Sequence, residues 1–402
     1  MLLERLSLHH YRNYSHLDVR FKEGVIVLQG ANAQGKTNLL EAIYLLATTK
    51  SSRTRSDADL ITWGPPDPFA PGPFARVTAH VKRRSGPLDL EIVVLPDADR
   101  AALAASREAP GRAQQSTETA AQTARKRFKV NGVQRRAGEV LGQVNAVLFA
   151  PTDVDIVAGS PALRRRYLDV ILCQVRPSYY RALQSYNKVL LQRNSLLRQV
   201  RDRQQPPDTL LYWDGKLLDY GTHLVAQRAE AVAQLAVSAA EMHERVSGGR
   251  ERLEMSYISS IPLEGGAEAG VRGAFEAELA AQRQRELAAG VSLAGPHRDD
   301  LGFSTSGVDV TAFGSRGQQR TVALAIKLAE LAYIRGEAGE WPILLLDDAT
   351  SELDTMRRAA VLELAREHPQ VFLTTAEPRT VTAAFDGAPQ VWRVEAGVLT
   401  PQ

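Results

Sequence analysis

Residues 1–30 show two hydrophobic patterns that predict β-strands. Apolar and polar residues alternate in the first part, as they do in half-buried strands. A continuous apolar run at 25–28 then ends near Gly30, as a buried central strand does. From 36 to 48 apolar residues recur every three or four positions, which predicts an amphipathic helix. The chain therefore begins with strands that lead through a glycine loop into a helix.

Alternation returns at 76–95, interrupted by Ser85-Gly86-Pro87, which predicts a β-hairpin. A further strand is expected at 127–130, before an Asn131-Gly132 turn. The stretch between, 97–124, is rich in Ala, Gln and Thr and has no apolar period. We expect it to be a disordered insertion between two strands.

From Pro161 the apolar spacing becomes helical. It continues to Leu235 around a turn at 204–207, which predicts an antiparallel helical hairpin of at most about 40 residues per helix. A strand-like segment at 252–258 and a helix ending at Ala289 follow.

After Gly290 the alternation of strands and helices resumes. We therefore expect an α/β domain formed by 1–160 and 291–402, with 161–290 inserted as a helical lobe. The segment 252–258 fits either part.

The loop after the buried strand has the spacing of a phosphate-binding loop, G-x-x-x-x-G-K-[ST]. Its backbone N–H groups and the helix N-terminus are suited to phosphate oxygens. Lys36 is expected to reach the β- and γ-phosphates of ATP, and the Thr37 hydroxyl to ligate Mg²⁺. The alternative is a glycine turn that matches by chance. The residues of the loop are Gly30, Ala31, Asn32, Ala33, Gln34, Gly35, Lys36 and Thr37.

The apolar run 343–346 ends in two carboxylates, which predicts a second part of the same site. Side chains at the carboxyl end of a buried strand reach the edge of the sheet where ligands bind. Asp347 would hold Mg²⁺, and Asp348 would orient or deprotonate the attacking water. Alternatively, the two acids form a solvated strand end.

Two further motifs precede helices and have local explanations as well. Ser315-Arg316-Gly317-Gln318 opens an amphipathic helix, so Ser315 either caps that helix or helps to bind an anion. Ser351-Glu352-Leu353-Asp354 resembles a capping box for a helix at 355–367.

Composition narrows the class of protein. The 402 residues carry a formal net charge of +3, with ordinary apolar and charged fractions, so disorder of the whole chain is excluded. A single cysteine, Cys173, excludes an internal disulfide and a cysteine-based zinc site. No apolar run approaches the ~20 residues of a membrane span. We expect a soluble cytoplasmic protein without membrane partners.

Positive charge is concentrated at 164–203, where ten basic residues face two acidic ones. A helical arm of one sign suits contact with nucleic-acid phosphates, although a solvated charged face is the alternative. Aromatic residues are not interleaved, which favours duplex DNA over single strands. The predicted DNA contacts are Arg164, Arg165, Arg181, Lys188, Arg193 and Arg198. His297, with Asp299 and Asp300, could be taken for a metal site, but a lone histidine is more often structural.

In this order, the motifs resemble the ABC-type ATPase heads of the SMC superfamily. The segments 11–14, 35–44, 149–153, 164–169 and 295–300 look in particular like those of the RecF family of bacterial recombination mediators. This resemblance covers nearly the whole chain. It implies a phosphate-loop α/β core, an antiparallel β subdomain and an inserted α-helical lobe.

The resemblance also implies a function. RecF proteins bind ATP, dimerise around it, hydrolyse it weakly with DNA stimulation, and bind DNA near single-strand/duplex junctions. Their partners are RecR and RecO, which lead to RecA loading. By analogy Ser315, Gly317 and Gln318 would meet the γ-phosphate in trans, and Ser351, Leu353 and Asp354 would cross the dimer interface. Arg12 and Asn13 would touch the nucleotide, and Thr374 or Thr375 stands where many ABC proteins carry a switch histidine.

One departure from the family concerns the phosphate loop itself, where Ala33 replaces a usual glycine. If that residue needs a positive φ, alanine costs on the order of 1 kcal/mol. Two other functions stay open: an ABC ATPase that energises a transporter, and a non-hydrolytic SMC-like DNA clamp. The basic arm disfavours the transporter, and the short hairpin disfavours an SMC protein with long arms.

Overall fold

A computed structural model gives the structure of most of the chain. It describes residues 1–54, 56–62, 73–96, 124–249, 251–263, 268–348, 355–376, 385 and 389–402. The predicted disordered insertion at 97–124 lies outside the described residues except for Ala124, which begins a strand.

The chain packs into two compact units. The first combines Met1–Pro151 with Ile334–Gln402, and the second is Thr152–Tyr333. The predicted helical lobe, 161–290, falls within the second unit, which also contains flanking residues on both sides. The strand predicted around 252–258 belongs to this second unit as well.

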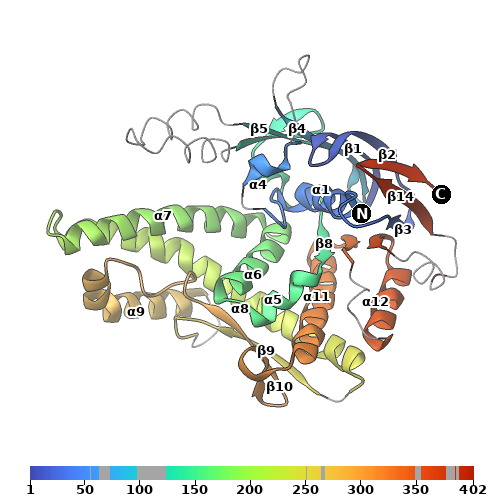
Figure 1. Ribbon diagram of the computed structural model, residues 1–402. Helices are drawn as coiled ribbons and strands as arrows, with labels where there is room; N and C mark the ends of the chain where they lie inside the picture. The colour runs from blue at the N-terminus through green and yellow to red at the C-terminus, as the bar shows by residue number, and fades with distance from the viewer. Residues whose placement is uncertain are drawn as a thin grey trace, which may run out of the picture. The chain divides into compact units, whose positions relative to one another are not determined.

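A mostly parallel sheet forms one layer of the first unit (Figure 1). Its strand order is β15-β14-β3-β13-β12-β8, with only β15 antiparallel to its neighbour. The predicted strand before the glycine loop is β3, and it lies between two strands from the other end of the chain. The bounds are Gly24–Gln29 (β3), Ala146–Phe149 (β8), Ile343–Leu346 (β12), Gln370–Thr375 (β13), Gln390–Glu395 (β14) and Val398–Pro401 (β15).

An antiparallel sheet with the order β2-β1-β4-β5-β6-β7 forms another layer of this unit. The predicted hairpin is confirmed as β4 and β5. The strand expected at 127–130 begins three residues earlier, and it turns at Asn131 and Gly132, which both have positive φ. The bounds are Leu2–Tyr11 (β1), Tyr14–Arg20 (β2), Ala75–Arg83 (β4), Gly86–Pro96 (β5), Ala124–Val130 (β6) and Val133–Arg135 (β7).

Helix α1 (Lys36–Thr48) supplies the centre of the first unit's core. Its apolar residues, among them Leu39, Ile43 and Leu46, join the inner faces of both sheets in one buried cluster. Burial of this stripe explains why the 3.6-residue pattern predicted the helix correctly. Helix α12 (Thr355–Glu367) packs against β3. The core thus fixes the phosphate loop, which lies between β3 and α1.

The second unit is mainly helical and contains the predicted antiparallel hairpin. Arg193 of α7 pairs with Asp214 of α8, while Arg176 pairs with Glu230, so the two helices run in opposite directions. They contain 25 and 37 residues, within the predicted limit of about 40, and α7 is the shorter one because Pro177 starts a new helix after α6. The bounds are Pro161–Val175 (α6), Pro177–Arg201 (α7), Leu211–Ser247 (α8) and Glu268–Ala289 (α9).

A small sheet, β11-β10-β9, and the helix α11 complete the second unit; the last residues of α11 belong to the first. Among the described helices, none combines the length and the apolar character that crossing a membrane requires. The remaining bounds are Asp57–Leu60 (η1), Ala137–Val140 (α4), Pro151–Asp153 (η2), Val154–Ala158 (α5), Pro207–Leu210 (η3), Leu253–Ile258 (β9), Asp300–Thr305 (β10), Val308–Asp309 (β11), Val310–Phe313 (α10) and Arg316–Ala338 (α11).

Candidate functional site

The phosphate loop has a backbone that only glycine tolerates at two positions. Gly30 has a φ of +156°, and a Cβ atom there would lie 2.3 Å from the carbonyl oxygen of Val394. Gly35 has a φ of +115°, and its Cβ would lie 2.7 Å from the Asn13 side chain. Both glycines of the motif are therefore required by close contacts as well as by the turn.

Thr37 and the two carboxylates at the end of β12 come together, as the sequence led us to expect. The Thr37 hydroxyl donates to Asp347 Oδ1 at 2.8 Å, and the Thr374 hydroxyl donates to the same oxygen at 3.0 Å. The backbone N–H of Asp348 donates to Thr374 Oγ1 at 2.8 Å. Thr374 thus connects the two acids, which makes it, rather than Thr375, the residue of β13 that completes this group.

Charge and burial suit this group to a nucleotide and a divalent cation. Burial raises the pKa of Asp347, although the hydrogen bonds from Thr37 and Thr374 oppose the shift. Burial also lowers the pKa of Lys36, against the attraction of Asp348 and Asp347. The Lys36 ammonium donates to the carbonyl oxygens of Gly30 and Ala31, at 2.5 and 2.8 Å. A hydroxyl and a carboxylate that converge from two elements are the oxygen ligands that Mg²⁺ takes alongside water and phosphate.

Arg12 and Asn13 hold the loop from the turn between β1 and β2. The Arg12 guanidinium forms two bonds to the buried carboxylate of Glu41 in α1, at 2.9 and 2.8 Å. It also donates to the carbonyl oxygen of Asp59 at 2.8 Å. Asn13 Nδ2 donates to the Gln34 carbonyl oxygen at 2.9 Å. Arg12 therefore contacts α1, and Asn13 contacts the phosphate loop.

Tyr14 is a part of the site that we did not predict. Its hydroxyl donates to the carbonyl oxygen of Gly35 at 2.9 Å, from a ring that is fully buried. In the sequence, Tyr14 stands out only as the last residue of the segment 11–14 that resembles the RecF family, without a role of its own. Its contact with the loop depends on tertiary packing and has no local signal.

Ala33 has a φ of +64°, so this residue does need the positive φ at which alanine is less stable than glycine. Replacing it by glycine is expected to raise the free energy of unfolding by about 1 kcal/mol, because the left-handed backbone disfavours a Cβ. Thermal denaturation measures this change. The control is Ala233→Gly on the exposed face of α8, where glycine is expected to cost about 1 kcal/mol. A loss of stability in both variants would contradict the strain at Ala33.

Ser315 and Gln318 form a reciprocal capping box at the start of α11. The Ser315 hydroxyl accepts from the backbone N–H of Gln318 at 3.2 Å, and the Gln318 side chain accepts from that of Ser315 at 3.0 Å. Gln318 Nε2 also donates to Glu251 at 2.8 Å. The local explanation of this motif is thus present, and a role in trans stays a proposal. Ser351, Leu353 and Asp354 lie outside the described residues.

Three predicted DNA contacts, Arg181, Lys188 and Arg198, are exposed on α7. Their spacings of seven and ten residues keep them within about 100° of the helix circumference. They therefore form a basic stripe, named here the arm stripe, that a phosphate backbone can reach. Arg165 is half-buried and donates to the carbonyl oxygen of Asp299 at 2.7 Å.

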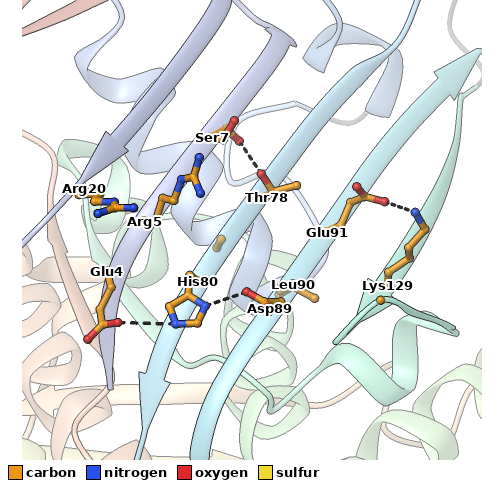
Figure 2. Close-up of a pocket in the computed structure, with 12 residues that line it drawn as sticks. Glu4, Arg5, Ser7, Arg20, Thr78, His80, Asp89, Leu90, Glu91 and Lys129 are labelled. Atoms are coloured by element: carbon orange, nitrogen blue, oxygen red, sulfur yellow. Dashed lines mark hydrogen bonds and ion pairs between the residues drawn. The ribbon is translucent and has the colours of Figure 1, made fainter.

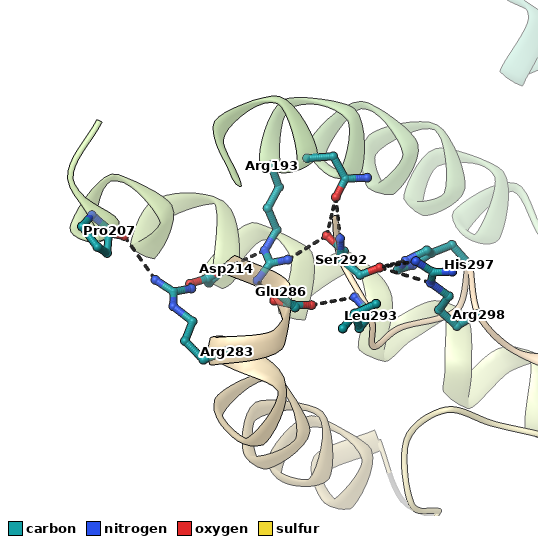
Figure 3. A network of polar contacts seen from close by, with 10 residues as sticks. Arg193, Pro207, Asp214, Arg283, Glu286, Ser292, Leu293, His297 and Arg298 are labelled. Carbon is teal, nitrogen blue, oxygen red and sulfur yellow. Dashed lines mark hydrogen bonds and ion pairs between the residues drawn. The ribbon is translucent and has the colours of Figure 1, made fainter. Parts of the chain in front are cut away.

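Arg164 and Arg193 are buried, which corrects their prediction as DNA contacts. Arg164 forms two bonds to Asp300, at 2.6 and 2.8 Å. Arg193 is 0% exposed and donates to Asp214, Glu286 and Ser292 (Figure 3). A guanidinium without accessible surface does not reach DNA, so both residues have structural roles.

His297 and its acidic neighbours are also structural. The imidazole lies between the Tyr186 hydroxyl, at 2.7 Å, and the carbonyl oxygen of Ser292, at 3.1 Å. Burial lowers its pKa to about 4, so the ring is neutral at pH 7. Asp299 accepts from Tyr257 and Ser260, while Asp300 holds Arg164. The polar groups of this motif therefore form hydrogen bonds and ion pairs that connect α6, α7 and β10.

A shallow hollow of about 700 Å³ lies on the outer face of the antiparallel sheet (Figure 2). Its charges pair with each other: His80 contacts Asp89 at 2.7 Å, and Lys129 contacts Glu91 at 2.8 Å. None of the residues that line it belongs to the phosphate loop. The hollow is thus separate from the nucleotide site.

Comparison with known proteins agrees with these features. The profile of the RecF/RecN/SMC N-terminal domain family matches residues 2–400. The DNA replication and repair protein RecF of Chloroflexus aggregans is 42% identical over 408 residues, which cover 99% of each chain. A solved structure of the recombination mediator protein RecF with ATP, from the RecFOR pathway, has a TM-score of 0.83 at 29% identity. It covers 100% of this chain and 97% of that one.

The predicted fold class is confirmed as well. The SMC head domain of Pyrococcus furiosus, 16% identical, aligns with a TM-score of 0.51 and covers 100% of this chain and 95% of its own; this likeness concerns the fold alone. The fold is thus that of an SMC-type ATPase head. It contains the phosphate loop, the paired acids, the capped helix α11 and the helical lobe. The chain belongs to the RecF family of DNA replication and repair proteins.

Proposed function

We propose that this protein is an ATP-switched DNA-binding mediator of recombinational repair. ATP with Mg²⁺ closes a homodimer on duplex DNA near single-strand junctions, and slow, DNA-stimulated hydrolysis reopens it. The main support is the convergence of Thr37 and Asp347 beside a phosphate loop that ends in Lys36. The solved RecF relative was determined with ATP, which supports the choice of nucleotide.

The residues of the first unit divide the work at the nucleotide. The loop N–H groups and Lys36 bind the phosphates, and the Lys36 ammonium exchanges the Gly30 and Ala31 carbonyls for phosphate oxygens. Thr37 and Asp347 would hold Mg²⁺, which would neutralise phosphate charge. Asp348, with its backbone fixed by Thr374, orients or deprotonates the attacking water.

The dimer supplies the second half of the site. Ser315, Gly317 and Gln318 of one copy contact the γ-phosphate bound by the other, and by the resemblance to the RecF family Ser351, Leu353 and Asp354 would belong to the same interface. In this role Ser315 and Gln318 exchange their capping bonds for the γ-phosphate at the N-terminus of α11, where backbone N–H groups favour an anion. Because the γ-phosphate contacts both copies only in the closed state, ATP favours closure and its loss favours opening.

DNA binding is assigned to the arm stripe, and Arg165 of α6 is kept as a further candidate contact. Contacts of this kind neutralise phosphates and read no sequence, which fits a protein that acts at many junctions. The solved relative is a recombination mediator of the RecFOR pathway. By the resemblance to the RecF family, the partners of this chain would be RecR and RecO, and the outcome would be RecA loading. We place this chain in the same sequence of events.

Sedimentation with and without ATP–Mg²⁺, combined with duplex binding, tests the proposal. The wild type is expected to dimerise with ATP and to bind DNA more tightly, and Lys36→Met and Ser315→Arg are expected to lose both effects. Lys36 binds the phosphates, and an arginine at 315 blocks the partner's γ-phosphate. A monomer indifferent to ATP, or DNA binding untouched by either change, would remove the switch. Dimerisation without phosphate release would indicate the non-hydrolytic clamp instead.

A further inference from the structure

Two hairpin turns from opposite ends of the chain meet the phosphate loop at one residue, Gln34. The turn between β1 and β2 contributes Asn13, whose side chain donates to the Gln34 carbonyl oxygen at 2.9 Å. The turn between β14 and β15 contributes two backbone N–H groups. That of Gly397 donates to the same carbonyl at 3.1 Å, and that of Ala396 donates to Gln34 Oε1 at 2.7 Å.

The C-terminal hairpin also touches the loop and the other turn sterically. A Cβ atom on Gly397 would lie 2.2 Å from the carbonyl oxygen of Asn13, and Gly397 has a φ of +78°. A Cβ on Gly30, at the start of the loop, would lie 2.3 Å from the Val394 carbonyl oxygen. The hairpin backbone therefore lies against the loop at Gly30 and against the other turn at Asn13, with no room for a side chain on Gly30 or Gly397.

These contacts fix the direction of one peptide group in the loop. In a planar trans peptide the C=O and the following N–H point in opposite directions. Since two donors hold the Gln34 carbonyl on the side of the turns, the N–H of Gly35 points to the other side. That N–H begins the series that continues into the N-terminus of α1, where an anion is favoured.

We propose that Asn13, Gln34, Ala396 and Gly397 form a loop clamp that holds the phosphate loop in its nucleotide-binding conformation. The C-terminal hairpin is then a positioning element for ATP, although it lies outside the phosphate-loop motif. The inference rests on the proposed function, because it assumes that the loop binds ATP. It assigns a role to Gln34 that the G-x-x-x-x-G-K-[ST] spacing leaves unspecified.

Two glycine variants with the same φ isolate the clamp from backbone strain. Gly397→Ala adds a methyl group at the contact with Asn13. Gly132→Ala, in the turn between β6 and β7, has the same φ of +78° and no atom within 4 Å of the new Cβ. Binding of a fluorescent ATP analogue is expected to weaken about tenfold in Gly397→Ala, because small displacements of a binding group are costly. Gly132→Ala is expected to stay within about twofold, since its strain lies elsewhere.

A third variant tests the hydrogen bond itself. Gln34→Met keeps the length of the side chain but places the thioether sulfur at the amide carbon and a methyl group at the amide oxygen, so the Ala396 N–H loses its acceptor. We expect about threefold weaker binding, since the bond from the Ala396 N–H is lost together with the 3.4 Å bond from Gln34 Nε2 to the Asn32 carbonyl oxygen. In steady-state ATP hydrolysis, the KM for ATP is expected to rise while kcat changes less, because the clamp acts on binding of the nucleotide.

Lys36→Met separates failure of this inference from failure of the proposed function. If Lys36→Met abolishes binding while Gly397→Ala and Gly132→Ala bind alike, the clamp is overturned and the nucleotide site stands. If Lys36→Met binds the analogue as well as the wild type, the nucleotide site itself is wrong. Should Gly397→Ala fail to fold, an unchanged affinity in Gln34→Met overturns the clamp, and a weakened affinity supports it.

Discussion

Replacing Arg193 by alanine is expected to lower the free energy of unfolding by about 3–5 kcal/mol, since a buried ion pair loses one partner. Arg193 donates to Asp214 and Glu286 at 2.7 and 2.6 Å, and Glu286 is 0% exposed (Figure 3). The truncation leaves the Glu286 carboxylate buried without its cation. It also opens a cavity among α7, α8 and α9, which adds to the cost.

Urea denaturation followed by circular dichroism at helical wavelengths measures this loss. The matched control is Arg198→Ala, five residues along the same helix and exposed. Its stability is expected to change by less than about 0.5 kcal/mol. Its DNA affinity is expected to fall, with a salt dependence smaller by about 0.9 per lost phosphate contact. A stable Arg193→Ala variant with weakened DNA binding would return Arg193 to the DNA interface.

Replacing Asp347 by asparagine is expected to reduce ATP turnover by at least about 100-fold, as loss of a charged ligand at a metal does. Asparagine has nearly the same shape, and its Oδ1 can still accept from the Thr37 and Thr374 hydroxyls. The fold is therefore retained while the charge that attracts Mg²⁺ is lost. Since the change removes a cation ligand, higher Mg²⁺ concentrations are expected to restore part of the activity.

Phosphate release measured across a Mg²⁺ titration tests this expectation. Nucleotide binding in EDTA is the internal control and is expected to stay within about twofold of wild type, because the loop and Lys36 are unchanged. Thr374→Ser keeps the hydroxyl that holds Asp347 and is expected to keep its Mg²⁺ dependence. An Asp347→Asn enzyme with normal turnover and normal Mg²⁺ dependence would place the cation on other ligands.

The sequence predicted a helix or strand correctly where its local apolar spacing alone determines that element. Helix α1 has the bounds expected from its apolar spacing, since the same stripe fills the core between the sheets. Asp347 and Thr37 were expected to meet because a strand end and a loop at one edge of a parallel sheet are close by topology. The positive φ of Ala33 follows from the turn that the motif requires.

Contacts between distant parts of the chain were beyond these patterns. Arg193 and Arg198 have the same charge on the same helix, yet one is buried and the other exposed. The difference depends on Glu286, 93 residues away, which the charge count of the arm did not include. Similarly, Gln34 receives a bond from Ala396, 362 residues away. Burial and pairing at such positions depend on packing that sequence spacing does not encode.

The place of β3 in its sheet has a consequence for biosynthesis. This strand pairs with β13 and β14, which are synthesised long after it. At a translation rate of roughly 5–20 residues per second, β13 is synthesised on the order of tens of seconds after β3. During that interval the apolar run at 25–28 has no sheet partners, whereas the β1–β2 and β4–β5 hairpins can pair locally. The nascent chain therefore exposes part of its future nucleotide core until β13 and β14 have been synthesised.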